Sequence, residues 1–167
     1  MEQNEKLKVY LETSFVSYLA GGVTTDAKIA ADQAYTRLWW EKESTNVEVF
    51  ISGYTIAECE AGKIGKSTER LAILEGLAVL SGNEETESEL ARKLIEGHAL
   101  PEKESTDALH IAAAAIGGMD IILTWNCRHL ANPHTLPITK KIISQAGFSC
   151  PEIMTPKTFL ENMDMEA

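Results

Sequence analysis

Short apolar segments rich in β-branched and aromatic residues alternate along this chain with longer segments of helical spacing. Such alternation is typical of β-α-β units, in which a helix returns the chain so that successive strands run parallel. We therefore expect an α/β fold, a three-layer α/β/α sandwich with a mainly parallel central sheet. No linker, repeat or low-complexity tract interrupts the pattern, and 167 residues suit a single domain spanning residues 1–167.

The boundaries of these elements follow from caps, prolines and glycines. Strands are expected at residues 8–11, 47–51, 77–80, 120–124 and 151–154. Helices are expected up to 19, over 26–42, 52–61 and 67–75, from 83 or 86 to about 98, over 107–116 and 139–145, and from 156 onward. Thr13 or Ser14 is the predicted cap of the first helix and Thr106 that of the sixth. Pro137 belongs to a predicted turn, and Pro156 takes the first position of the last helix.

The charge of the chain excludes one class of protein. Twenty-five acidic residues against fifteen basic ones give a formal net charge of −10. Proteins that coat DNA regardless of sequence depend on many cationic contacts with phosphates, and this chain does not suit that role. A nuclease stays compatible with the charge, because bound metal ions supply positive charge locally.

Cysteine usage and hydropathy favour a cytoplasmic location. The three cysteines, at positions 59, 127 and 150, are far apart and form no CxxC pair. They support neither a zinc cage nor a disulfide framework, which fits a reducing cytosol. The N-terminus is polar, without signal-peptide character, and the longest apolar stretch, residues 111–119, is too short to cross a membrane. We therefore expect a cytoplasmic protein without membrane association.

Polar residues directly follow several of the predicted strands. Glu12 comes after the first strand, Glu58 lies in the segment after the second, and Asn126 follows the fourth, whereas Asp107 opens the helix before that strand. Because ligands of open α/β sheets bind beyond the carboxyl ends of the strands, we expect three carboxylates and one amide to converge there. Oxygen ligands of this kind suit Mg²⁺ or Mn²⁺, and a bound ion would offset the repulsion between them.

Each of these residues also has a purely structural interpretation. Glu12 and Asp107 could be first-turn charges that complement a helix dipole. Glu58 lies close to Glu60, so either acid could face the site, or both could face water. Asn126 could simply shape the turn after its strand. The functional hypothesis therefore depends on the whole group rather than on any one member.

Other residues near these segments are weaker candidates. His110 lies on the same helix face as Asp107 and is expected to be a packed core histidine. Trp39 and Trp40 could stack on a base, although an amphipathic helix usually buries one residue of such a pair. The basic residues that could contact RNA, or could be ordinary surface, are Lys63, Lys66, Arg70, Arg128 and His129.

The segments VYLETSFVSYL, ISGYTIAEC, TDALHIAAA and DIILTWNCRHLAN occur in this order along the chain, followed by a final TPKTFL. Together they resemble the motifs of PIN-domain proteins, and most of all those of the ribonuclease toxins of VapBC-type toxin–antitoxin systems. The resemblance implies a compact α/β/α domain that cleaves single-stranded or structured RNA with Mg²⁺ or Mn²⁺. It places Glu12, Glu58 and Asp107 at the three acidic positions, and Asn126 where a fourth acid often stands.

Two positions differ from the usual pattern of the family. The first acid is usually Asp, and Glu12 is longer by one methylene group, while Asn126 offers an oxygen but no charge. Thr13 and Thr124 would stand beside the site as hydroxyl supports. The resemblance further implies an antitoxin protein that covers the acidic groove, and a homodimer or larger homo-oligomer. The alternative hypothesis, motivated by Glu12 and Asn126, is a PIN-like module that binds RNA or protein without cleavage.

Overall fold

A central sheet of parallel strands organises the chain in a computed structural model that describes residues 5–62 and 66–166. Within these residues the sheet has five strands in the order β3-β2-β1-β4-β5, and every neighbouring pair is parallel. The strands are β1 (Lys8–Leu11), β2 (Glu48–Ile51), β3 (Ala78–Val79), β4 (Ile121–Leu123) and β5 (Glu152–Met154). All five lie within the predicted strand segments.

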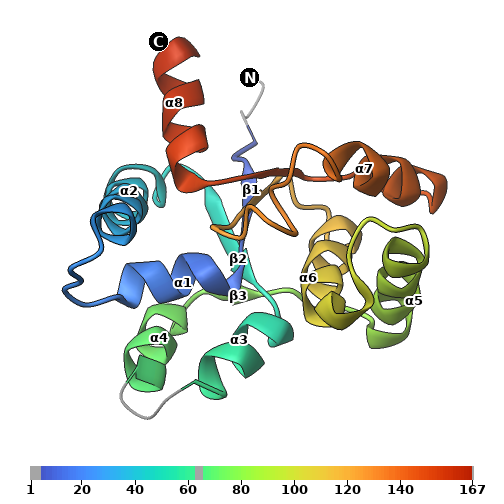
Figure 1. Cartoon of the computed structure of the whole chain (residues 1–167), viewed down its shortest axis with the longest axis horizontal. Coiled ribbons are helices and arrows are strands. Elements are labelled where there is room, and N and C mark those ends of the chain that lie inside the picture. Colours follow the sequence, from blue (N-terminus) through green and yellow to red (C-terminus); the bar gives the residue numbers. More distant parts are fainter. Residues whose placement is uncertain (1–4, 63–65, 167) are drawn as a thin grey trace.

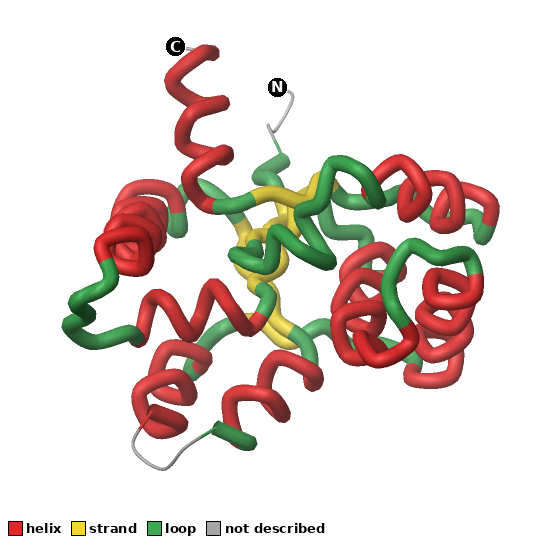
Figure 2. Tube along the Cα trace, viewed as in Figure 1, coloured by secondary structure: helices red, strands yellow, loops and turns green. Residues whose placement is uncertain are grey.

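Helices cover both faces of this sheet (Figure 1). They are α1 (Thr13–Ala20), α2 (Ala27–Glu43), α3 (Gly53–Glu60), α4 (Lys66–Leu74), α5 (Glu84–Glu96), α6 (Ser105–Ile116), α7 (Leu136–Gln145) and α8 (Pro156–Glu166), with a 3₁₀ turn, η1 (Glu102–Glu104), before α6. In Figure 2 the strands form a narrow band between two groups of helices, with α5, α6 and α7 on one side and α1, α2, α4 and α8 on the other. This arrangement confirms the predicted three-layer sandwich.

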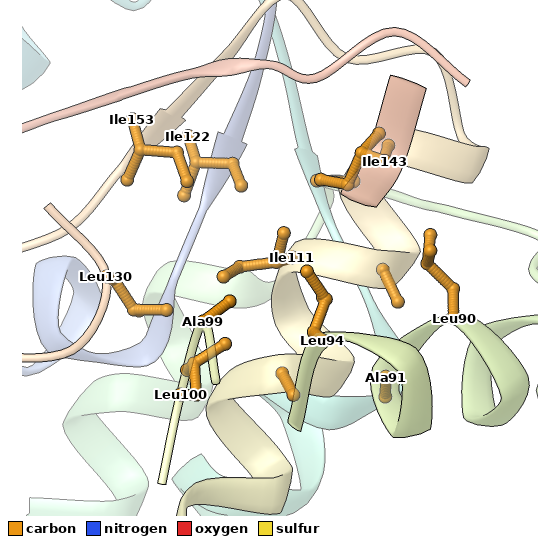
Figure 3. Packing of buried hydrophobic residues seen from close by; sticks show 14 of the residues in the cluster. Leu90, Ala91, Leu94, Ala99, Leu100, Ile111, Ile122, Leu130, Ile143 and Ile153 are labelled. Atoms are coloured by element: carbon orange, nitrogen blue, oxygen red, sulfur yellow. The ribbon is translucent and has the colours of Figure 1, made fainter. Parts of the chain in front are cut away.

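Each face of the sheet has its own hydrophobic core. Successive residues of a strand point to opposite faces, so Tyr10 of β1 joins the core under α5, α6 and α7, whereas Val9 and Leu11 join the core under α1, α2, α4 and α8. Figure 3 shows the first of these cores, in which Leu94 of α5 and Ile143 of α7 gather around α6. Burial on both faces explains why β1 is apolar without alternation from Val9 to Leu11.

Helix α6 is buried between the sheet and α5, and its buried side chains are mostly small. Residues 112–115 form an unbroken run of four buried alanines. Alanine also has the highest helix propensity, so this run stabilises the helix while it permits close packing. The helix ends where Gly118 adopts a left-handed backbone with φ 74°, in agreement with the predicted stop.

Three predicted helix boundaries are corrected by the structure. The cap of α1 is Glu12 rather than Thr13 or Ser14, because its carboxylate accepts the Ser14 backbone N–H. Thr106 does not cap α6: the helix begins one residue earlier, directly after η1, without a side-chain cap. Pro137 lies in the first turn of α7, where a missing N–H costs nothing, rather than in a turn before it. The predicted start of α8 at Pro156 is confirmed.

Among the helices that the structure describes, none has both the length and the apolar character needed to span a bilayer. The three cysteines, which all lie in described parts of the chain, are free thiols.

Candidate metal centre

The strand order reverses at β1, which places a crevice at the carboxyl ends of β1 and β4. From β1 the chain continues to β2 and β3 on one side, and then crosses to β4 and β5 on the other. In open α/β sheets, ligands bind at such a switch point, outside the carboxyl ends of the strands. The residues that follow β1 and β4 are therefore the first candidates for a functional site.

Glu12 follows β1 directly and is held by three hydrogen bonds. Its Oε2 atom accepts the backbone N–H of Ser14 at 3.0 Å, the Ser14 hydroxyl, and the Thr124 hydroxyl at 2.7 Å. The residue is only 4% exposed, and these donors replace the water that the carboxylate loses on burial. Thr124 thus supports Glu12 through its hydroxyl, as predicted.

Glu58, and not Glu60, faces this site from α3. Its Oε1 atom accepts the Thr13 hydroxyl at 2.8 Å and contacts Nε2 of His110, whereas Glu60 is exposed to solvent. Burial by itself would raise the pKa of Glu58, but the hydrogen bonds from His110 and Thr13 outweigh burial and lower it. Glu58 is therefore ionised at neutral pH.

His110 is fully buried, as predicted for a packed histidine, but it also holds Glu58 in place. An ionised carboxylate only accepts hydrogen bonds, so Nε2 of His110 donates to Glu58. On the other side of the ring, Nδ1 lies 2.5 Å from the hydroxyl of Tyr10, which also lies 2.7 Å from the hydroxyl of Ser52. Glu58 is thus connected to the centre of the sheet by a buried chain of polar groups.

The part that His110 and Tyr10 play was missed at the sequence level. The spacing of three residues between Asp107 and His110 was a signal, because it places both on one face of α6. Tyr10 offered only a hydroxyl inside an otherwise apolar strand. That hydroxyl meets partners at least 42 positions away, Ser52, Thr55 and His110.

Asp107 lies in the first turn of α6, with its carboxylate directed at the same crevice. Nδ2 of Asn126 donates to Oδ2 of Asp107 at 3.1 Å. Burial, then the negative charge of Glu12, then a hydrogen bond and charge from Glu104 raise the pKa of Asp107 to about 7. Asp107 therefore lies near enough to Glu12 for the two carboxylates to repel each other.

Asn126 shapes the turn after β4, which is one of the two roles considered from the sequence, and it also contacts Asp107. Its Oδ1 atom accepts the backbone N–H of His129 at 3.0 Å, and its own backbone N–H donates to the Thr124 hydroxyl at 3.0 Å. These bonds shape the turn after β4. Its amide nitrogen at the same time fixes Asp107. Direct or water-mediated ligation by Asn126 stays a prediction.

Three side chains present ligand atoms close enough to share one metal ion. A carboxylate oxygen of Glu12, one of Glu58 and a ring nitrogen of His110 all lie within 4.8 Å of one another. Asp107 is not a member of this group, but it stands beside it and pairs with Asn126. The structure thus brings the predicted residues together as two adjacent pairs, Glu12 with Glu58 and Asp107 with Asn126.

The structure places the weaker candidates for RNA contact in different surroundings. Trp39 is completely buried in the core beneath α1 and α2, so it cannot stack on a base. Trp40 is half-buried against the same core. His129 makes a 3.5 Å ion-pair contact with Glu104. Lys63 lies outside the described residues.

No protein-family model matches the chain, and no curated protein sequence matches it. Among solved structures, the chain is similar to the crystal structure of VapC20 from Mycobacterium tuberculosis, a toxin that cleaves the sarcin–ricin loop. The two share 18% sequence identity with a TM-score of 0.53, and the match covers 84% of this chain and 95% of VapC20. At this identity the similarity is one of fold. The chain therefore has the PIN-like α/β/α fold that its motifs predicted.

Proposed function

We propose that this protein is a metal-dependent endoribonuclease that hydrolyses phosphodiester bonds of RNA. The observation that carries the proposal is the meeting of Glu12, Glu58 and Asp107 at the switch point of the sheet, although they are far apart in sequence. Acidic groups alone would repel a polyanion such as RNA, so this arrangement suits RNA only together with a cation.

The donor set fits a hard divalent cation. We propose Glu12, Glu58 and Asp107 as the residues that hold Mg²⁺ or Mn²⁺, with Asn126 as a ligand directly or through water. Carboxylate oxygens are the ligands these ions prefer, whereas imidazole nitrogen suits Zn²⁺, Cu²⁺ or Fe²⁺ better. The raised pKa of Asp107 supports this choice, because a cation at the crevice would relieve its repulsion from Glu12.

Buried Glu12 and partly exposed Glu58 each accept hydrogen bonds at only one carboxylate oxygen. Glu12 receives its three hydrogen bonds at Oε2, and Glu58 receives its two at Oε1. Within the described residues no hydrogen bond reaches the other oxygen of either side chain. Each carboxylate is therefore held by one oxygen and offers the other, the arrangement in which outer groups orient a metal ligand.

These residues would position the reacting groups. A bound cation would orient a water molecule for attack on phosphorus and would stabilise the negative charge that develops on the phosphate oxygens. Thr13 and His110 keep Glu58 ionised and fixed, and the Thr124 hydroxyl fixes Glu12 in position. The catalytic residues in this proposal are Glu12, Glu58, Asp107 and Asn126.

The fold shared with VapC20 supports a further part of the proposal. We infer that the chain is the toxin of a cytoplasmic toxin–antitoxin pair, inhibited by an antitoxin protein that covers the acidic crevice. We also infer that it acts as a homodimer or larger homo-oligomer, in which two crevices would form a longer path for RNA.

The decisive test is cleavage of an RNA mixture in Mg²⁺, in Mn²⁺ and in EDTA. The parent chain should cleave RNA only with the cation. Glu58→Gln and Asp107→Asn should each lower the rate by about 100-fold or more, because each removes a charge expected to bind the ion. Glu60→Gln is a matched control, since this exposed acid lies on the same helix two residues away. Equal rates for parent and Asp107→Asn, or no cleavage by either, would favour the binding module.

A further inference from the structure

An open cavity of about 740 Å³ lies at the far end of α1 from the metal centre. Its walls come from the C-terminal part of α1 and the glycine-containing loop that follows, from α2, and from α4. The side chains used below are Tyr18, Gln33, Lys66, Glu69 and Arg70, all of which line it. The proposed nuclease reaction assigns no role to any of them.

A continuous set of contacts joins this cavity to the metal centre. The backbone N–H of Trp125 donates to the Ser14 hydroxyl at 2.8 Å, and that hydroxyl in turn bonds Glu12. The Trp125 indole packs against the Tyr18 ring with centroids 5.7 Å apart, and its Nε1 donates to Thr36 of α2 at 2.8 Å. The aromatic pair is therefore fixed between the acidic crevice and the cavity.

The distance from crevice to cavity suits a neighbouring nucleotide. Ser14 and Tyr18 are four residues apart on α1, which corresponds to about 6 Å along the helix axis. Stacked nucleotides in one strand are about 3.4 Å apart. A strand held at the crevice could therefore place a base within one or two nucleotides of the reacting phosphate against the half-buried Tyr18 ring.

Gln33 gives the cavity an unused hydrogen-bonding group. Its side chain is 93% buried, being only 7% exposed, and within the described residues it makes no hydrogen bond. The amide lies against Gly21, where any larger residue would collide with it. The amide atoms of Gln33 are not among the sealed, unpaired polar atoms of the described residues, so they reach the solvent of the cavity. A primary amide can both donate to and accept from the edge of a base. This group therefore favours a ligand with paired donors and acceptors.

The charges around the cavity nearly balance. Lys66 and Arg70 line it together with Glu69, and the Nη2 atom of Arg70 is held by the carbonyl of Cys59 at 3.1 Å. Asp32 is close enough that its charge contributes to raising the pKa of Tyr18. With positive and negative charges nearly balanced, electrostatic attraction of an RNA phosphate would not by itself bind RNA in this cavity. Stacking on an aromatic ring is worth about 1–3 kcal/mol per base and needs no net charge.

We propose that this cavity binds one unpaired nucleotide of the RNA, with its base stacked on Tyr18 and hydrogen-bonded to the amide of Gln33. The inference rests on the proposed function, because it takes RNA to be the molecule at the crevice. The bound nucleotide has to be unpaired, since a base inside a duplex cannot leave its stack without a cost of a few kcal/mol.

The test is binding in Ca²⁺, which offsets the carboxylate charges but lacks the strict octahedral geometry of Mg²⁺, of fluorescently labelled single-stranded RNA oligonucleotides and of a duplex of the same sequence, with gels to show that the RNA stays intact. The parent chain should bind the single strand more tightly than the duplex. Tyr18→Leu should weaken single-strand binding by about 5- to 100-fold, whereas Tyr18→Phe, which keeps the ring, should stay within about twofold. Gln33→Leu should change the order of preference among oligonucleotides of the four bases.

The matched control is Tyr35→Leu, because Tyr35 is a half-buried tyrosine of α2 that faces Lys157 and does not line the cavity. It should bind RNA like the parent chain. The inference is wrong if Tyr18→Leu binds within twofold of the parent chain, or if duplex and single strand bind equally. A parent chain that binds through Tyr18 but cleaves nothing in Mn²⁺ would keep this site and refute the nuclease proposal. A Tyr18→Leu variant that cleaves RNA at the rate of the parent chain would keep the nuclease proposal and refute this nucleotide site.

Discussion

Buried polar side chains in this protein are paired across long stretches of sequence. The hydroxyl of Tyr10 lies within hydrogen-bond distance of Ser52, Thr55 and His110, and His110 contacts Glu58. Each of these groups has given up its contact with water, so each depends on the others to keep its hydrogen bonds. The carboxylates of the candidate metal centre are thus held by groups that lie deeper in the fold than the crevice itself.

Removal of one hydroxyl should expose this dependence. We expect Tyr10→Phe to lower the free energy of unfolding by about 1–3 kcal/mol, because it leaves buried partners unsatisfied. We also expect RNA cleavage to fall by about 10- to 100-fold through loss of orientation of His110 and Glu58. Urea unfolding and cleavage rates measure the two effects. The control is Tyr35→Phe, whose hydroxyl has no hydrogen bond within the described residues, and a Tyr10→Phe chain as stable and active as this control would contradict the prediction.

The raised pKa of Asp107 predicts an unusual pH dependence of stability without metal. Between about pH 4 and 7 the folded chain keeps a proton on Asp107 that the unfolded chain has already lost. The free energy of unfolding should therefore fall as pH rises through this range. Glu87, whose pKa burial also raises, adds a change of the same sign.

Unfolding of the EDTA-treated chain at pH 5, 6 and 7 measures this effect. Asp107→Asn should make the dependence clearly flatter, and Mn²⁺ should restore the stability of the parent chain at pH 7 because it offsets the carboxylate charges. An Asp107→Asn chain with the same slope as the parent would show that Asp107 does not hold the extra proton.

The sequence predicted the acidic residues of the site better than their supports. Glu12 and Asn126 directly follow strands, and parallel strands end at one edge, so their approach to each other follows from topology alone. The contact of Asp107 with Asn126 also fits this reasoning. The choice between Glu58 and Glu60, and the bond from His110, depend instead on how α3 and α6 are rotated against each other, which local spacing does not determine.

Among the secondary-structure elements, α6 depends most on close packing. Its alanine run is buried between the sheet and α5, with residues 112–115 at most 4% exposed. Small side chains at these positions allow the helix to bring Asp107 and His110 to the carboxyl ends of β1 and β4. A larger residue in this run would push the helix away from the sheet, because a well-packed core has no room for added methylene groups.

We expect Ala114→Leu to destabilise the fold by about 1–3 kcal/mol through overpacking. Thermal unfolding measures the loss, at about 2–4 °C per kcal/mol for a chain of this size. Ala34→Leu on the exposed surface of α2 is the matched control and should change stability by less than about 0.5 kcal/mol. Equal melting temperatures for the two variants would show that α6 does not pack as tightly as described.

The order of the elements was predictable and their exact ends were less so. A glycine or proline lies close to four of the five strands of the described sheet, whereas β1 was marked by its apolar run and by the polar residues that follow it. The capping residue was predicted wrongly where the sequence offered several candidates. At the start of α1, Glu12, Thr13 and Ser14 can all cap the helix, and the structure shows that Glu12 does so. Pro137 was assigned to a turn, but it lies in the first turn of α7. Proline is common both in loop turns and in the first turn of a helix, so its presence alone does not tell the two apart.

For the whole molecule, one topological feature creates the site. After β1 the chain adds β2 and β3 on one side of the sheet and then β4 and β5 on the other side. The residues after β1 and β4 therefore face each other across a crevice. Two hydrophobic cores keep the strands and helices in this arrangement. The acidic groups are thereby held together despite their repulsion, and hydrophobic burial supplies the free energy that this requires.

Calorimetric titration of the metal-free chain with Mn²⁺ tests directly whether these carboxylates hold a cation. The parent chain and Glu60→Gln should bind Mn²⁺ with the same affinity, and Glu58→Gln and Asp107→Asn should each weaken binding by about 10-fold or more. No binding by the parent chain, or equal binding by all four proteins, would show that Glu12, Glu58 and Asp107 do not form a metal centre.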